Sequence, residues 1–119
     1  MRSILKWLPL GSAEEITSSE LSQLLGDPTI QIVDVRFESE FEQSRIAGAR
    51  NLPITRFTRD AIEALQLDPD LQTVCICLSA HRSIPAVRQL ESLGFSRVVQ
   101  LAGGMKAWWA GDHPCVGSS

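Results

Sequence analysis

The sequence predicts an α/β fold, an open and mostly parallel sheet of about five strands with helices on both faces. Apolar, β-forming runs alternate along the chain with segments of helical periodicity, and the links between them are short. Residues 73–77 lack the polar–apolar alternation of a half-exposed strand, as expected for a parallel sheet that is covered on both faces. Strands and helices that take turns in this way are typical of parallel sheets, in which each helix carries the chain back across the sheet.

The first predicted helix and strand lie before residue 36. Thr17 or Ser18 can cap a helix that runs to Leu25, because a hydroxyl oxygen accepts the free N–H groups of a first helical turn. The Gly-Asp-Pro sequence at 26–28 ends this helix. Residues 30–35 are strongly β-forming and are predicted as a central strand.

A short polar helix is predicted next, from Ser39 to Ile46, and Gly48 closes it. Residues 51–54 are predicted as a second, short strand. Thr58 can cap the following helix. The apolar face of that helix consists of Ala61, Ile62 and Leu65.

The last part of the chain begins with the buried strand at 73–77. Apolar residues at three-residue spacing then predict a helix from Ile84 that ends at Gly94, and residues 98–101 form the last predicted strand. The final helix follows a glycine pair and carries two tryptophans that we expect to pack against the sheet, Trp108 and Trp109.

Size and composition are those of one globular domain. The chain has 119 residues, 44% of them hydrophobic, and a formal net charge of −3. We expect the domain at 14–112, between an apolar N-terminal tail or edge segment at 1–13 and a C-terminal tail at 113–119. The apolar start is too short to span a bilayer, so no transmembrane segment is expected, although contact of residues 1–10 with a membrane surface stays open.

Charge and cysteine content narrow the partners and the compartment. The basic residues are scattered along the sequence, which argues against a nucleic-acid partner. Three cysteines form no disulfide framework and indicate free thiols in a reducing compartment, the cytoplasm by default.

The most informative motif is VCICLSAHRS at 74–83. A buried strand ends in Cys77, four residues follow, and then come Arg82, Ser83 and the helical pattern. A thiol at the carboxyl end of a strand, facing the first turn of a helix, lies where free N–H groups and the helix dipole favour negative charge. The motif therefore predicts a cysteine nucleophile that acts on a small anion.

Three separated segments of the chain resemble the rhodanese-like sulfurtransferases. The family patterns are D-x-R, E-F and H-I-x-G-A-x-N-I-P in the first segment, a loop of cysteine, four residues, arginine and serine or threonine in the second, and L-G-F, L-x-G-G and W in the third. The matching residues are 32–36, 40–41 and 45–53, then 77–83, then 93–95 with Val99, Leu101, Gly103, Gly104 and Trp108.

The resemblance implies a single rhodanese-like domain in which Cys77 carries a persulfide. Asp34 and Arg36 match positions that are chiefly architectural, and Arg82 matches an arginine that shapes the loop and, with His81, favours anions. The N–H groups of the loop would stabilise the persulfide anion; its residues are Leu78, Ser79, Ala80, His81, Arg82 and Ser83.

The implied reaction moves a sulfane sulfur from a small anionic donor such as thiosulfate, or from a persulfide, to a thiol or cyanide. A protein could serve as the sulfur donor or acceptor, and no metal or organic cofactor is required. The chain departs from the family at Arg45, where histidine is usual, and at Ala80, where glycine is common. If residue 80 needs a positive φ, alanine there costs about 1 kcal/mol.

Loop length favours sulfur over phosphorus chemistry. Four residues separate Cys77 from Arg82, which makes a loop of six residues as in the sulfurtransferases. Phosphatases and arsenate reductases of similar fold carry five residues between cysteine and arginine, so their loop is one residue longer. Three alternatives stay open: a persulfide carrier, a non-catalytic interaction module, and a phosphatase or arsenate reductase.

The remaining candidates have simpler readings. Cys75 is expected in the core, with a role as resolving thiol as the alternative, and Cys115 is expected to be an exposed bystander, with a redox or sulfur-relay role as the alternative. His81 is expected to be a solvent-facing loop residue, and a zinc site is disfavoured because a Cys-x-Cys stands without a second pair. The cysteines and histidines concerned are Cys75, Cys77, His81, His113 and Cys115.

Overall fold

The computed structural model describes residues 13–79 and 81–117, so Ala80 and nearly all of the expected tail at 1–13 lie outside the described residues. It confirms the predicted architecture: five strands form one sheet in the order β1-β5-β4-β2-β3, and every pairing between them is parallel. The strands are β1 (Glu15–Ile16), β2 (Ile30–Asp34), β3 (Arg50–Asn51), β4 (Gln72–Ile76) and β5 (Val98–Leu101).

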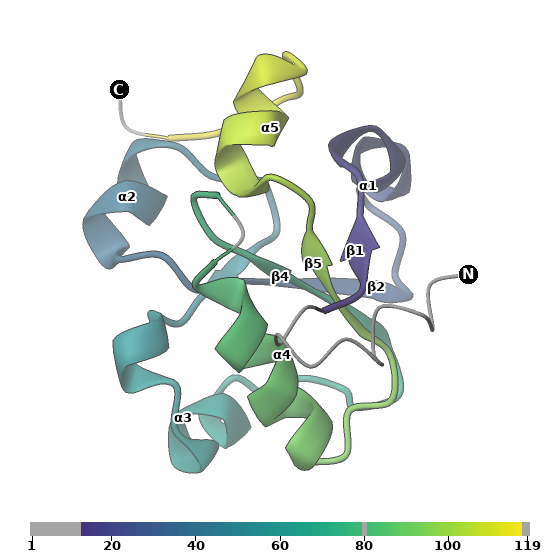
Figure 1. Cartoon of the computed structure of the whole chain (residues 1–119), viewed down its shortest axis with the longest axis vertical. Coiled ribbons are helices and arrows are strands. Elements are labelled where there is room, and N and C mark those ends of the chain that lie inside the picture. Colours follow the sequence, from purple (N-terminus) through teal and green to yellow (C-terminus); the bar gives the residue numbers. More distant parts are fainter. Residues whose placement is uncertain (1–12, 80, 118–119) are drawn as a thin grey trace.

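Helices cover both faces of the sheet (Figure 1). α3 and α4 pack on one face, and α1 and α5 pack on the other. The helical elements are α1 (Ser18–Leu24), α2 (Glu38–Gln43), the 3₁₀ helix η2 (Ile54–Arg56), α3 (Arg59–Ala64), α4 (Ser83–Ser92) and α5 (Gly104–Ala110).

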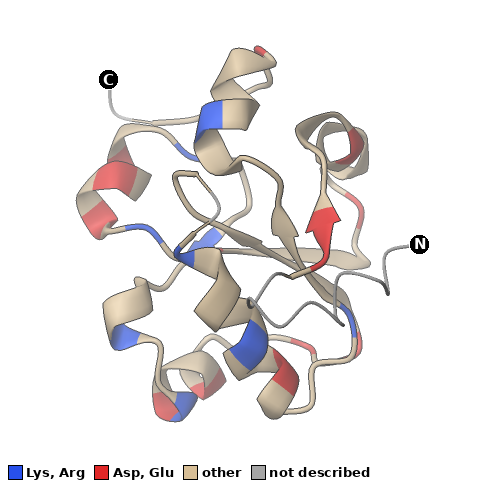
Figure 2. Ribbon diagram, viewed as in Figure 1, with Lys and Arg blue, Asp and Glu red and all other residues tan. Residues whose placement is uncertain are grey.

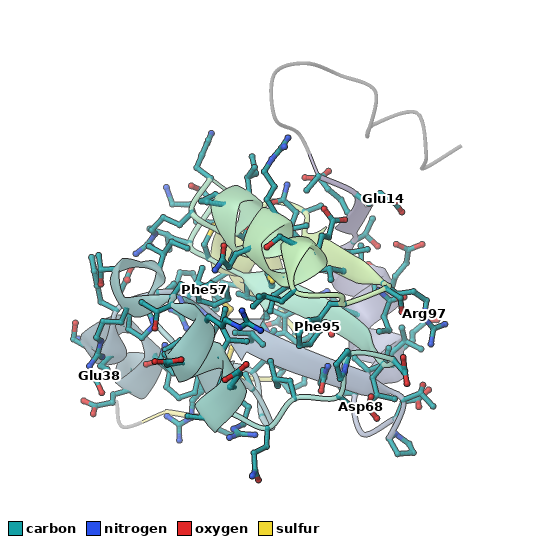
Figure 3. The ribbon with its side chains drawn as sticks, turned by 90° about the horizontal axis from the view of Figure 1, so that it is seen from below. Glu14, Glu38, Phe57, Asp68, Phe95 and Arg97 are labelled. Carbon is teal, nitrogen blue, oxygen red and sulfur yellow. The ribbon has the colours of Figure 1, made fainter. Side chains whose placement is uncertain are left out.

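Each face of the sheet has its own apolar core, because successive side chains of a strand point to opposite faces. On the α3/α4 face, Val33 of β2 and Cys75 of β4 pack with residues of both helices. On the α1/α5 face, Ile32 and Val74 pack with Leu21. Figure 3 shows the α4 side from below, with Phe57 and Phe95 labelled there and the charged Glu38, Asp68 and Arg97 nearer the rim.

Two predicted helix starts are present as expected. Thr17 Oγ1 accepts from the N–H of Glu20 at 3.0 Å, and the Glu20 carboxylate accepts from the N–H of Thr17 at 2.9 Å, which is a complete capping box for α1. Thr58 Oγ1 accepts from the N–H of Ala61 at 3.2 Å and caps α3.

Most element bounds differ from the prediction by one or two residues, and three elements differ more. The predicted strand at 51–54 is the two-residue β3 (Arg50–Asn51), after which Pro53 has no N–H to donate and the chain turns into η2. The polar helix ends at Gln43 rather than Ile46, because Arg45 forms an antiparallel bridge with Val116. β1, which was not predicted as a strand, exists because its two residues pair with β5.

In the described part of the chain, neither a basic stripe nor a membrane-spanning helix is present. Lys and Arg are spread over separate elements rather than gathered in one stripe (Figure 2). Within residues 13–79 and 81–117, no helix is long and apolar enough to cross a membrane.

Candidate active site

Cys77 lies where the sequence predicts it, between the end of β4 and the start of α4. β4 is a central strand with β5 on one side and β2 on the other, so the loop that follows it leaves from the middle of the sheet (Figure 1). Only 1% of the surface of Cys77 is exposed, and its side chain belongs to the core on the α3/α4 face. α4 begins at Ser83, directly after Arg82.

The backbone of the loop is fixed by the first turn of α5. The N–H of Met105 donates to the carbonyl oxygen of Cys77 at 2.8 Å, and the N–H of Lys106 donates to that of Leu78 at 3.0 Å. Gly104 makes this approach possible: its φ is +59°, and a Cβ would lie 2.6 Å from the carbonyl carbon of Leu78. The Gly-Gly sequence at the start of α5 therefore holds the base of the Cys77 loop.

Arg82 is tied to α2. Its Nη1 and Nη2 donate to the two carboxylate oxygens of Glu40 at 2.9 and 3.1 Å. Hydrogen bonding to Arg82 lowers the pKa of Glu40, and the same pair raises the pKa of Arg82. The Arg82 guanidinium also lies 5.4 Å from the ring centroid of the half-exposed Phe37. Much of the positive charge expected at the mouth of the loop is therefore offset by a carboxylate.

Asp34 and Arg36 form a buried ion pair at the end of β2. Arg36 Nη2 donates to Asp34 Oδ2 at 2.8 Å, and its Nε donates to Oδ1 at 3.0 Å. The guanidinium reaches onward to the carbonyl oxygens of Glu40 and Ser44 at 3.3 and 2.7 Å. Both residues thus join the strand end to α2 and the segment after it, which agrees with an architectural role.

A chain of side-chain contacts leads away from the Cys77 thiol. Its Sγ lies 3.6 Å from Ser83 Oγ, and Ser83 Oγ donates to Gln100 Oε1 at 2.6 Å. Gln100 Nε2 in turn donates to Glu15 Oε2 at 3.1 Å. Ser83 and Gln100 are buried, whereas Glu15 is at the surface on the edge strand β1.

The other cysteines lie in contrasting environments. Cys75 is fully buried, as expected for a core residue, and burial raises the pKa of its thiol, with a further contribution from Cys77. Cys115 is exposed, and its Sγ lies 3.8 Å from the carbonyl oxygen of His113. Among the described residues, no three or more His, Cys, Asp or Glu side chains are grouped so that they could hold a metal ion.

The remaining predicted residues fall into different surroundings. His81 is exposed, as expected, and its Nδ1 lies 3.4 Å from Ser79 Oγ. Trp108 is buried between α5 and the sheet, as expected. Trp109 is 41% exposed and donates from Nε1 to Ser44 Oγ at 2.9 Å, so it does not pack against the sheet as predicted. Ala80 lies outside the described residues, so its expected backbone cost stays a prediction.

Sequence reasoning missed Glu40, Gln100 and Glu15. Glu40 lies in the family-like E-F pair but was given no role. Gln100 did carry a signal, because a single amide inside the apolar strand VVQL must find a buried hydrogen-bond partner. Nothing in the local sequence distinguishes Glu15 from the other surface carboxylates.

Comparison with known proteins gives a consistent family signal. The family model of the rhodanese-like domain matches residues 17–111. A sulfurtransferase of Allochromatium vinosum is 36% identical over 86% of this chain and 94% of its own length. The thiosulfate sulfurtransferase GlpE of Shewanella oneidensis is 30% identical over 83% of this chain and 95% of its own. The crystal structure of a rhodanese-like domain protein from Staphylococcus aureus is 30% identical, with a TM-score of 0.71 over 88% of this chain and 98% of that one.

Other relatives are longer proteins. The chain spans 55% of the length of an uncharacterized protein of Synechocystis, to which it is 33% identical. It spans 51% of a putative sulfur carrier protein of Bacillus subtilis, to which it is 31% identical. The match therefore spans about half the length of some of the curated relatives.

Proposed function

Because the chain belongs to the rhodanese-like domain family, we propose that it is a sulfurtransferase that moves a sulfane sulfur through a persulfide on Cys77. The proposed donor is thiosulfate or a persulfide, and the proposed acceptor is cyanide or a thiol, including a protein thiol. The relatives named sulfurtransferases support sulfur transfer as the general activity. The observation that carries the proposal is the position of Cys77 between the end of β4 and the first turn of α4.

The proposed reaction is a double displacement. The Cys77 thiolate attacks the outer sulfur of thiosulfate, the sulfur–sulfur bond breaks, and sulfite leaves with the bonding electron pair. An acceptor thiolate or cyanide then attacks the outer sulfur of the Cys77 persulfide, and the Cys77 thiolate is the leaving group. The acceptor carries the sulfur away as a new persulfide or as thiocyanate, and no metal or organic cofactor takes part.

The loop contributes electrostatic stabilisation in this proposal. Backbone N–H groups between Leu78 and Ser83, with those of the first turn of α4, would face the negative charge of the persulfide. Fixed donors of this kind are each worth about 3 kcal/mol when they are well placed. The hydrogen bonds from Met105 and Lys106 to the loop carbonyls support the proposal, because they fix the backbone that carries those donors.

A persulfide carrier loaded by a protein donor is the second candidate. Two observations favour it: Cys77 is 1% exposed, and the charge of Arg82 is paired with Glu40 rather than free to attract thiosulfate. The cytoplasm is the proposed compartment for either function, because all three cysteines are free thiols.

Intact mass spectrometry after incubation with thiosulfate, and separately with a low-molecular-weight persulfide, tests the proposal. We expect the parent protein to gain the mass of one sulfur atom, Cys77→Ser to gain none, and cyanide to remove the adduct. Cys115→Ser is the matched control and should load like the parent. Loading by the persulfide alone would favour the carrier. No adduct from either donor would reject sulfur transfer, and release of phosphate from an aryl phosphate would favour a phosphatase.

A further inference from the structure

The contacts of Ser83 connect the Cys77 thiol to the surface of the sheet edge. Gln100 lies on β5 directly opposite Glu15 of β1, as Cα partners in the parallel pairing. The three contacts Cys77–Ser83, Ser83–Gln100 and Gln100–Glu15 measure 3.6, 2.6 and 3.1 Å. A continuous line of polar atoms therefore runs from a buried sulfur to an exposed carboxylate.

The chemistry of these groups gives the line a direction. An ionised carboxylate only accepts hydrogen bonds, so Glu15 requires the NH₂ group of Gln100. The amide oxygen of Gln100 then faces Ser83, and the hydroxyl donates its one proton to it. In the contact between Cys77 Sγ and Ser83 Oγ either atom could donate. When the Ser83 proton is given to Gln100, the Ser83 oxygen offers Cys77 only lone pairs, and a protonated thiol is then the donor.

We propose that Glu15 and Gln100 are positioning residues that turn the Ser83 hydroxyl away from Cys77 and thereby restrain formation of its reactive thiolate. This inference rests on the proposed role of Cys77 as the nucleophile. The restraint opposes the N–H groups of the first turn of α4, which favour negative charge. Glu15, at the exposed end of the line, therefore influences from the surface how readily the Cys77 thiolate forms.

Other charged groups near Cys77 do not replace this effect. Cys75 of β4 interacts with Cys77 and stays protonated because it is buried. Arg82 interacts with Cys77 from the loop, but it is paired with Glu40 of α2 and also interacts with Asp34 of β2. The Ser83 hydroxyl is distinct because its orientation is set by Gln100 of β5 and Glu15 of the edge strand β1.

The pH profile of Cys77 alkylation by iodoacetamide tests the inference, with peptide mapping to separate Cys77 from Cys75 and Cys115. In Gln100→Met the Ser83 hydroxyl no longer donates to residue 100 and can turn to donate to the thiolate. We expect the midpoint of the profile to fall by about one pH unit, the size of one hydrogen bond. Glu15→Gln should shift it in the same direction by less, because its amide lets Gln100 rotate.

Two controls keep the result specific. Glu14→Gln removes the same charge one residue earlier, outside β1 and outside the line of side-chain contacts to Gln100, and should leave the midpoint unchanged. In a Ser83→Ala background, Gln100→Met should have no further effect. An unchanged or raised midpoint in both Glu15→Gln and Gln100→Met, or a shift that persists without the Ser83 hydroxyl, would overturn the inference.

The readout is independent of sulfur transfer. Alkylation needs a thiolate that the reagent can reach but no persulfide, so a shifted profile in a protein that forms no persulfide would support the line of contacts and reject the proposed function. Glu15 is exposed, so the surface variant tests the inference even if Gln100→Met does not fold.

Discussion

Arg82 and Glu40 form a bidentate ion pair that joins the loop after β4 to α2, although they lie 42 residues apart in the chain. Glu40 also accepts from the N–H of Phe37 at 2.8 Å, so it holds the start of α2 as well as the loop. The two elements that flank the Cys77 loop, α2 and α4, are therefore connected through one carboxylate.

Glu40→Gln should slow the loading of Cys77 with sulfur. The amide has one oxygen and cannot accept from both Nη1 and Nη2 of Arg82, so the loop loses its fixed position. We expect the loading rate to fall about tenfold. Mass spectrometry of samples quenched at successive times after the addition of thiosulfate measures this rate. Glu63→Gln breaks the exposed pair with Arg59 and should leave it unchanged. Equal rates in Glu40→Gln and the parent would show that the pair does not position the loop.

The same pair should make stability depend on pH. Hydrogen bonding to Arg82 lowers the pKa of Glu40 below its ordinary value of 4.5. The folded state then binds fewer protons than the unfolded state around this pH, so the stabilisation is present above 4.5 and lost as the pH falls through the folded-state pKa. Urea denaturation should show a constant difference between the parent and Glu40→Gln near neutral pH. The difference should shrink on acidification, and growth instead would contradict the assignment.

Arg36→Ala should destabilise the fold strongly. It leaves Asp34 as an unpaired charge in a fully buried position, which costs about 3–5 kcal/mol. Arg36→Lys should also be costly, because lysine cannot reproduce the forked contacts to Asp34 and Ser44. Chemical denaturation measures both. The control Arg56→Ala breaks an exposed pair with Glu38 and should lower the free energy of unfolding by about 1 kcal/mol or less. An equally small decrease in Arg36→Ala would refute the prediction.

Gly104→Ala should affect both stability and the site. Its Cβ would collide with the backbone of Cys77 and Leu78, in addition to the cost of a positive φ. Gly94→Ala is the matched control, because Gly94 has a φ of +96° but open space around its Cβ position. We expect Gly94→Ala to cost about 1–2 kcal/mol and Gly104→Ala clearly more, with slower sulfur loading in Gly104→Ala alone. Equal losses in thermal unfolding would mean that the contact with the loop does not matter.

The sequence predicted the parts of this fold that depend on local pattern. Apolar runs such as 30–35 and 73–77 identified the central strands, and the hydroxyl residues Thr17 and Ser18 identified the start of α1. The position of Cys77 before a helix followed from the same patterns. These features are determined within a few residues of the chain, where periodicity and capping act.

The parts that the sequence did not predict depend on distant partners. β1 has only two residues and is a strand because Glu15 and Ile16 lie beside β5. The contacts of Glu40 with Arg82 and of Glu15 with Gln100 span 42 and 85 residues. No local pattern carries such pairings, so a single sequence read without the fold leaves these residues without a role.

The pairing of β1 with β5 also constrains how the protein can be made. The first strand of the described chain finds its place only beside the last, so during synthesis the sheet stays incomplete until residue 101 has left the ribosome. Contacts between segments this far apart in sequence are typical of slow folding steps. We therefore expect the link from Glu15 to the Cys77 loop to be among the last native contacts to form on the nascent chain.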